Sequence, residues 1–257
     1  MAHMDIVGLP AFRDNYIWLL HDGENAAVVD PGDAAPVLAY LDTHALALRA
    51  ILVTHHHADH VGGIAELVRR DRPPVFGPAA EDIKHVTVVL QEGDEITLPG
   101  LNERFSVLDL PGHTIGHIGY YRPKLLFCGD TLFAGGCGRL FEGSPSQMWR
   151  SLSKLAALPS DTRVYCAHEY TEANLRFALT VEPGNVLLQK RADQVAELRR
   201  RGQPSVPALL SDELATNPFL RCDQPEVIKS AQAHGTRPMM RSEDVFAHLR
   251  AWKDNFA

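Results

Sequence analysis

The stretch Ile51–Gly63, "ILVTHHHADHVGG", places four histidines and an aspartate within six positions, directly after an apolar run. An expression tag sits at a chain terminus, whereas this cluster lies inside an amphipathic pattern and therefore belongs to the fold. The apolar run predicts a strand that ends at Thr54, and side chains alternate along an extended segment. We therefore expect His55 and His57 to point to one side and His56 to the other.

The glycine-rich, amphipathic stretch that follows predicts a helix beginning near Asp59 and His60. These two side chains then lie beside the same point as those of His55 and His57. Four ligand-type side chains in so short a segment are more than one tetrahedral metal ion accepts while keeping an open position. The spacing therefore predicts two metal ions.

Three further candidate ligands also come just after apolar runs: His113 in "VLDLPGHTIGH", Asp130 in "LLFCGDTLF" and His168 in "RVYCAHEY". Strand ends gather at one edge of a sheet, where α/β folds build their sites. Imidazole nitrogen and carboxylate oxygen suit zinc, and a carboxylate can bridge two ions, so we expect Asp130 to be the bridge. His56 and His117 are candidates to hold the second nitrogen of a ligating imidazole. A single histidine at a strand end is more often a surface hydrogen-bonding residue, and only the cluster makes ligation the better interpretation.

Composition excludes several classes of function. The chain has 257 residues, 45% of them hydrophobic, and a formal net charge of -7, which argues against a nucleic-acid partner. Its apolar runs are far shorter than a membrane span and it opens without a charged-then-apolar leader, so we expect no membrane association and a cytoplasmic location. The four cysteines form no C-x-x-C pair and are expected to be reduced, mostly buried thiols.

The chain divides by pattern near Tyr170. Before it, short β-rich apolar runs alternate with amphipathic helical stretches, which predicts layered α/β packing. After it, residues 172–179, 185–202 and 242–256 have helical patterns, separated by a loop over 203–221. We expect an α/β domain over residues 1–170 and a smaller, mainly helical domain over 171–257.

The segments "THHHADHVGG", "DLPGHTIGH", "LFCGD" and "YCAHEY" together resemble the metallo-β-lactamase superfamily, whose signature is H-x-H-x-D-H followed by a lone His, an Asp and a last His. The resemblance spans roughly residues 4–170 and implies an αββα sandwich with two metals at one edge. It assigns seven ligands: His55, His57 and His113 to the first metal, Asp59, His60 and His168 to the second, and Asp130 to both.

Other stretches resemble one family within that superfamily, glyoxalase II or hydroxyacylglutathione hydrolase. They are "AFRDNYIWLL", "GCGRLFEGSPSQMW", "YTEANLRFA", "NPFLR" and "HLRAWKDNF", and members of the family add a helical C-terminal domain, as this chain does. The resemblance implies a glutathione thioester as substrate, bound by Arg139, Tyr170, Arg250 and Lys253. Arg250 and Lys253 are three residues apart and share one helix face, although the same spacing fits a solvated helix with Glu243 and Asp244 nearby.

The reaction implied is hydrolysis of S-(2-hydroxyacyl)glutathione, with S-D-lactoylglutathione as the family's substrate, to glutathione and D-lactate in the second step of methylglyoxal detoxification. A hydroxide between the metals would attack the thioester carbonyl, and Asp59 and Asp130 would be the catalytic carboxylates. Two divalent ions are implied; zinc is expected, and iron or manganese fit the same ligands. We expect a monomer whose partner is its small-molecule substrate.

The sequence leaves other functions open. A persulfide dioxygenase uses one iron, a β-lactamase or lactonase cleaves a ring, and a phosphodiesterase acting on RNA would need a basic surface. A binding module with a closed, structural metal site and no catalysis is a further alternative. One departure from the family concerns Phe141, where some members have tyrosine: a phenyl ring donates no hydrogen bond, so a tyrosine-hydroxyl contact to the peptide would be missing.

Overall fold

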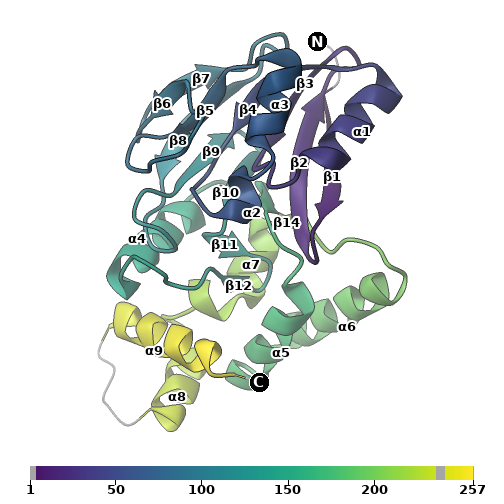
Figure 1. The fold of residues 1–257 in the computed structure, drawn as a ribbon. Helices are drawn as coiled ribbons and strands as arrows, with labels where there is room; N and C mark the ends of the chain where they lie inside the picture. The colour runs from purple at the N-terminus through teal and green to yellow at the C-terminus, as the bar shows by residue number, and fades with distance from the viewer. Residues whose placement is uncertain (1–3, 236–240, 257) are drawn as a thin grey trace. The chain divides into compact units, whose positions relative to one another are not determined.

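The computed structural model describes residues 4–235 and 241–256 of the chain (Figure 1). The chain divides into two compact units. The first comprises the residues up to Asp109 together with Ile115–Arg122 and Leu126–Gly129. The second comprises Leu110–Thr114, Pro123–Leu125 and the residues from Asp130 onward. These units differ from the two domains expected over residues 1–170 and 171–257, because they are defined by compactness alone. The domain boundary near residue 170 therefore stays a prediction.

The first sheet has six strands in the order β1-β2-β3-β4-β5-β6. β1 and β2 form an antiparallel hairpin and β3 pairs antiparallel with β2, whereas the pairs β3–β4, β4–β5 and β5–β6 are parallel. α1 supplies the crossover between β3 and β4, and α2 and α3 supply the one between β4 and β5, whereas β5 and β6 are joined without a helix. The strands are β1 (Asp5–Ala11), β2 (Asn15–His21), β3 (Asn25–Val29), β4 (Ala47–Leu52), β5 (Val75–Pro78) and β6 (Val88–Leu90).

Helices α1 (Ala34–His44), α2 (Ala58–Val61) and α3 (Ile64–Asp71) follow strands of this sheet. Asp33 caps α1, since its side chain accepts a hydrogen bond from the backbone N–H of Ala35. The buried faces of α1 and α3 join the apolar face of β4 in one hydrophobic core, which includes Val37, Leu41, Leu67 and Ile51. Figure 1 shows α1 and α3 beside the strands of this sheet. The core fixes where β4 ends and hence where the histidine cluster begins.

A second six-stranded sheet has the order β14-β13-β10-β9-β8-β7. Tyr120 on β9 ties it to the first sheet, because its buried hydroxyl donates to the carbonyl oxygens of Val53 at 2.8 Å and Phe76 at 3.3 Å. Between β8 and β10 the rings of Phe105 and Phe127 pack 6.0 Å apart. The strands are β7 (Glu95–Thr97), β8 (Arg104–Asp109), β9 (Ile118–Arg122), β10 (Leu125–Gly129), β13 (Arg163–Cys166) and β14 (Ala208–Leu209).

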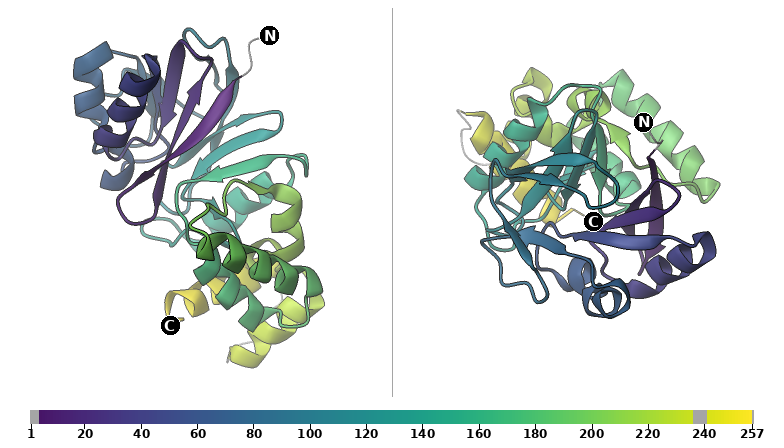
Figure 2. Two further views of the ribbon diagram at one scale, coloured as in Figure 1. Left: turned by 90° about the vertical axis from the view of Figure 1, so that its right-hand side faces the viewer. Right: turned by 90° about the horizontal axis from the view of Figure 1, so that it is seen from above.

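The second unit is mainly helical. After the two-stranded hairpin β11 (Leu132–Phe133) and β12 (Gly136–Cys137), it contains α4 (Pro145–Ala156), whose start is fixed by a capping box between Ser144 and Gln147. Figure 2 shows the later helices gathered in the green-to-yellow part of the chain. They are α5 (Thr171–Val181), α6 (Val186–Arg200), α7 (Leu210–Thr216), the 3₁₀ turn η1 (Pro218–Leu220), α8 (Pro225–His234) and α9 (Ser242–Asp254).

The apolar runs predicted as strands, from "YIWLL", "AAVVD", "AILVTH" and "PPVFG" to "DEITL", "FSVLDL", "IGYYR", "KLLFCGD" and "RVYCAHE", form β2 to β5, β7 to β10 and β13. The helical stretches "APVLAYLDTHAL", "GGIAELVRRD" and "SQMWRSLSKLAAL" form α1, α3 and α4, and the helical patterns over 172–179, 185–202 and 242–256 form α5, α6 and α9. The prediction of a loop over residues 203–221 was wrong in part, since this segment contains β14, α7 and η1. Three prolines, Pro204, Pro207 and Pro218, make the segment resemble a loop in sequence. Tertiary hydrogen bonds to Glu213 and Asn217 hold its short elements.

Candidate metal centre and substrate residues

The first set of candidate ligands lies where β4 runs into α2. Gly32 explains how this loop packs: a Cβ there would lie 1.8 Å from the carbonyl oxygen of Asp59, so only glycine allows the approach. Gly63 plays the same part on the other side, because its Cβ would lie 2.6 Å from the carbonyl oxygen of Pro31. The loop before α1 therefore packs directly against the segment that carries the candidate ligands. This close packing explains why a glycine stands at position 63.

The four side chains of this set converge as the sequence predicts. His55 Nε2 lies 3.1 Å from His57 Nδ1, and His60 Nε2 lies 3.6 Å from Asp59 Oδ2. The rings of His55 and His60 are 4.0 Å apart between centroids. His55 and His60 are fully buried, whereas Asp59 is partly exposed. A tetrahedral zinc ion with bonds of about 2.0 Å separates its ligand atoms by about 3.3 Å, so these distances suit ligands that share an ion.

The remaining ring nitrogens are held by residues that the sequence did not single out. His55 Nδ1 lies 3.0 Å from the hydroxyl of Thr54, and His60 Nδ1 lies 3.1 Å from Asp30 Oδ2. Asp30 is buried and also accepts the Thr54 backbone N–H and hydroxyl, both at 2.8 Å. Such contacts orient an imidazole so that its other nitrogen faces the metal. Asp30 ends the apolar run "AAVVD", the same strand-end position that marks the ligands, and this was the available signal.

His56 and His117 lie beside this set. His56 Nδ1 lies 3.0 Å from Glu81 Oε2, so the side chain turns to an acidic partner, in line with the expected alternation along the extended segment. The ring of His117 stacks on that of His55, with centroids 4.7 Å apart and an interplanar angle of 23°. We expected His56 and His117 to hold the second ring nitrogen of a ligating histidine. For His55 and His60 this nitrogen is instead held by Thr54 and Asp30, respectively.

The second set of candidate ligands, His113, Asp130 and His168, is buried in the second unit. One oxygen of Asp130, Oδ2, lies 3.4 Å from Nε2 of His113 and 3.4 Å from Nε2 of His168. A carboxylate oxygen placed between two imidazole nitrogens at this spacing is suited to two metal ions at once. The other nitrogen of His113 donates to the carbonyl oxygen of Arg139 at 2.8 Å, which leaves Nε2 facing Asp130.

Both sets fit a divalent metal by donor chemistry. Within the first set, His55 with His57, His55 with His60 and Asp59 with His60 each bring ligand atoms within 4.8 Å of one another. Neutral imidazole nitrogens and carboxylate oxygens are the ligands that zinc, iron and manganese accept. The residues of each set therefore lie close together, and their role as metal ligands stays a prediction.

Two aromatic residues lie against the second set. The ring of Tyr170 stacks on His168, with centroids 4.7 Å apart and an interplanar angle of 6°, and its side chain is partly exposed. Phe133 presents its ring edge-on to both His168 and Tyr170. Phe141 is exposed and packs edge-on against His113 with centroids 5.2 Å apart. Tyr170 and Phe141 are thus exposed aromatic residues in direct contact with two of these candidate ligands.

The three basic candidates for substrate binding differ in their surroundings. Arg139 is exposed and its Nε lies 3.3 Å from Asp254 Oδ1. Arg250 is only 6% exposed, and its guanidinium donates to the carbonyl oxygen of Cys137 and to Asp254, both at 2.8 Å. Asp254, which the sequence did not indicate, therefore joins both guanidinium groups. The glutathione-binding role of Arg139 and Arg250 stays a prediction, and Arg250 has structural contacts as well.

Lys253 is half-buried on the same helix. Its Nζ donates to the carbonyl oxygen of Ala173 at 3.3 Å and lies 5.5 Å from the centroid of the Phe177 ring. Burial, followed by the nearby charges of Arg250 and Arg176, lowers the pKa of Lys253 to about 8. An ammonium group with this pKa loses its positive charge as the pH rises through about 8, which is close to physiological pH.

The four cysteines are free and buried, as the sequence predicts. Burial raises the pKa of the Cys137 thiol to about 11 and that of the Cys166 thiol to about 12. Since the thiolate is the nucleophilic form, neither thiol is suited to nucleophilic catalysis near neutral pH.

Among the helices of residues 4–235 and 241–256, none is long and apolar enough to cross a membrane.

Comparison with known proteins agrees with this arrangement. The metallo-beta-lactamase superfamily profile matches residues 11–168, and the profile of the hydroxyacylglutathione hydrolase C-terminus matches residues 169–256. A hydroxyacylglutathione hydrolase of Ectopseudomonas mendocina is 55% identical, with 98% of this chain and 100% of the relative covered. One from Nitrosomonas eutropha is 53% identical, with 98% and 99% covered.

Solved structures share the fold. ETHE1 from Myxococcus xanthus matches with a TM-score of 0.65 at 24% identity, covering 98% of each chain, which shows the fold alone. TTHA1623, solved in a di-iron-bound form, matches with a TM-score of 0.53 at 34% identity, covering 64% of this chain and 91% of its own. The predicted α/β fold, metallo-β-lactamase-like with a helical C-terminal region, is confirmed. The chain belongs to the hydroxyacylglutathione hydrolase family of the metallo-β-lactamase superfamily.

Proposed function

We propose that this protein hydrolyses S-(2-hydroxyacyl)glutathione, with S-D-lactoylglutathione as substrate, to glutathione and a 2-hydroxy acid such as D-lactate. The activity would supply the second step of methylglyoxal detoxification. The observation that carries the proposal is Asp130, whose Oδ2 lies 3.4 Å from an imidazole nitrogen of both His113 and His168. Full-length similarity to hydroxyacylglutathione hydrolases supports the choice of substrate.

The two ligand sets together would hold two divalent ions. His55, His57 and His113 would bind the first, Asp59, His60 and His168 the second, and Asp130 both. When bound, such a pair of ions activates water as a nucleophile and stabilises the charge that develops on the thioester oxygen. We propose zinc for both positions; the di-iron form of the similar TTHA1623 makes iron the main alternative.

The chain's own residues would prepare this chemistry. Thr54 and Asp30 hold His55 and His60 in place before substrate arrives, and the Asn15 amide donates to Asp59 Oδ2 at 3.0 Å, which orients that carboxylate. Asp59 and Asp130 are the proposed catalytic carboxylates. No strong general acid is needed, because a thiol with a pKa of about 8.5 leaves readily as thiolate. The absence of a nucleophilic cysteine among the candidates is consistent with attack by water.

Substrate recognition is proposed for the mainly helical region over residues 171–257, with the hydrolase domain over residues 1–170. The boundary between the two family matches, at residues 168 and 169, supports this division. Arg139, Tyr170, Arg250 and Lys253 would bind the glutathione part, using cations for its carboxylates and an aromatic ring beside His168. A monomer in the cytoplasm remains the prediction for the state of the protein.

Turnover of S-D-lactoylglutathione, measured together with the metal content of the purified protein, tests the proposal. We expect about two ions per chain, activity that is lost with a chelator, and a loss of at least about 100-fold in Asp130→Ala. Activity that survives both treatments would exclude metal-dependent hydrolysis. A protein that holds metal but does not cleave the thioester would instead be a binding module with a structural metal site.

A further inference from the structure

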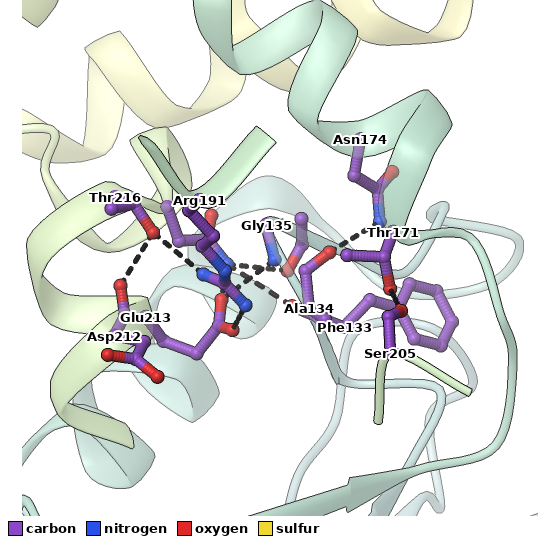
Figure 3. Close-up of polar contacts among 12 residues, drawn as sticks. Phe133, Ala134, Gly135, Thr171, Asn174, Arg191, Ser205, Asp212, Glu213 and Thr216 are labelled. Carbon is purple, nitrogen blue, oxygen red and sulfur yellow. Dashed lines mark hydrogen bonds and ion pairs between the residues drawn. The ribbon is translucent and has the colours of Figure 1, made fainter. Parts of the chain in front are cut away.

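A buried ion pair in the second unit has no part in the chemistry described above. Arg191 on α6 donates to Glu213 on α7 and, at 2.7 Å, to the hydroxyl of Thr216 (Figure 3). The Glu213 side chain is 0% exposed and that of Arg191 is 11% exposed. A buried carboxylate is tolerated only when its oxygens have well-placed donors, so the position of Glu213 is closely determined.

The second oxygen of Glu213 reaches the hairpin formed by β11 and β12. Oε2 accepts the backbone N–H of Gly135 at 2.8 Å and the amide of Asn217 at 3.0 Å. Gly135 has φ of +68°, the left-handed conformation that lets the chain turn between the two strands. Figure 3 shows the Glu213 carboxylate between the Arg191 guanidinium and Gly135. The turn of the hairpin is therefore tied to a charged group on α7.

Amide side chains hold the rest of the hairpin. Asn217 donates to the carbonyl oxygens of Gly136 at 2.9 Å and Phe133 at 3.3 Å, and Asn174 on α5 donates to that of Ala134 at 3.1 Å. A ladder of two residues per strand is too short to set this conformation by itself. Side chains from the helical region thus fix the backbone of the hairpin at each of its central residues.

The hairpin in turn supports two metal-ligand positions. It begins two residues after Asp130, and its Phe133 ring lies edge-on to His168, with centroids 5.8 Å apart and an angle of 88°. On the other side of His168, the backbone N–H of Ser205 donates to Glu169 at 2.9 Å, and the Ser205 hydroxyl donates to that of Thr171 at 2.6 Å. The Phe133 ring thus packs against His168, Ser205 holds two of the residues that follow His168, and Asp130 leads directly into the hairpin.

We infer that Glu213 is a positioning residue for the Asp130–His168 half of the metal centre, acting through the hairpin and Phe133, with Arg191 balancing its charge. The inference rests on the proposed metal centre. It gives the helical region a second role besides glutathione binding: it sets the distance between a bridging carboxylate and a terminal imidazole. Mutation of a residue that orients a metal ligand typically lowers metal affinity by about 10- to 100-fold.

The test measures metal binding as well as turnover. Glu213→Gln keeps the shape of the side chain but loses the charge that faces Arg191. We expect the ion held by His168 to bind about 10- to 100-fold less tightly in a chelator competition with the apoprotein, and the other ion, which shares only Asp130 with it, to lose less affinity. The metal content of the purified variant should fall toward one ion per chain, and kcat should fall more than KM rises.

Glu182→Gln is the matched control. Glu182 is a buried carboxylate of the same helical region that accepts hydrogen bonds from Arg221 at 2.7 and 2.9 Å and from Asn185 at 3.0 Å, and both of these residues lie outside the hairpin. It should lower the melting temperature and keep both ions at wild-type affinity. Phe133→Leu tests the last step separately, because it removes the ring edge from His168 and leaves the ion pair in place; we expect the same selective loss of one ion.

Wild-type affinity for both ions in folded Glu213→Gln would overturn the inference, as would an equal loss of metal in Glu182→Gln. If Glu213→Gln does not fold, wild-type affinity for both ions in Phe133→Leu overturns it instead. The proposed function is judged on the wild-type protein alone: two ions and thioester hydrolysis there support it whatever the variants show.

Discussion

Oδ2 of Asp30 lies 3.1 Å from Nδ1 of His60, and the same oxygen accepts the hydroxyl of Thr54 at 2.8 Å. One buried carboxylate thus orients a candidate ligand and the residue that holds another. Asp30→Asn should weaken binding of the ion held by His60 by about 10- to 100-fold, because an amide nitrogen cannot accept these bonds. Competition with a fluorescent chelator measures the effect. Asp33→Ala, which removes the cap of α1 and costs about 1 kcal/mol of stability, should leave metal affinity unchanged; equal losses in the two variants would contradict the assignment.

Gly129 stands directly before Asp130 with φ of +47°, and a Cβ there would lie 2.4 Å from Thr54 Oγ1 and 2.7 Å from His117 Nε2. Gly129→Ala should therefore lower the free energy of unfolding by at least about 2 kcal/mol, through backbone strain and the clash. The urea midpoint measures the loss. Gly184, whose Cβ would meet nothing within 4 Å, supplies the control, and Gly184→Ala should change stability by less than about 1 kcal/mol. Similar midpoints for both variants would show that the backbone has more room than the structure describes.

Substitutions of Arg250 and Lys253 should have different effects on stability, although both residues lie on α9. Arg250→Ala removes charged hydrogen bonds to Cys137 and Asp254 from a buried position, so we expect a loss of about 2 to 3 kcal/mol of stability together with a higher KM. Lys253→Ala should raise KM with less than about 1 kcal/mol of lost stability. Thermal unfolding and steady-state kinetics on lactoylglutathione distinguish the two. A large loss of stability in Lys253→Ala, or wild-type stability in Arg250→Ala, would contradict the structural role assigned to Arg250.

Binding of glutathione should depend on pH through Lys253, whose pKa is lowered to about 8. The protonated form attracts a carboxylate and is present below that pKa, so affinity should fall as the pH rises through about 8. The dissociation constant of S-methylglutathione, an unreactive analogue, can be followed by calorimetry from pH 6.5 to 9.5. Lys253→Arg keeps its charge over the whole range and should remove the dependence. A profile that is identical in wild type and Lys253→Arg would assign the titration to another group.

The grouping of the candidate ligands within each set could be predicted because the signal is local. His55 to His60 lie within six positions, and His113, Asp130 and His168 each follow an apolar run. Strand ends meet at a sheet edge, so residues distant in sequence could be grouped without coordinates. The strands and helices with clear apolar periodicity were predicted for the same reason.

The residues that support the ligands could not be predicted in this way. Asp30 also follows an apolar run, but nothing in the sequence pairs it with His60, which is thirty residues later. Helical spacing placed Arg250 and Lys253 on one face and said nothing of which face is buried. Glu213 lies in a proline-rich segment whose helix α7 depends on partners from β11, β12 and α6, and such long-range partners leave no local pattern.

The contacts of Thr54, Asp30 and the Arg139 carbonyl oxygen have a consequence for the protons of the site. Each lies at Nδ1 of a histidine, so in the neutral rings of His55, His60 and His113 these contacts place the proton on Nδ1 and the lone pair on Nε2. An ion would therefore meet rings whose Nε2 needs no exchange of a proton with Nδ1 before it binds.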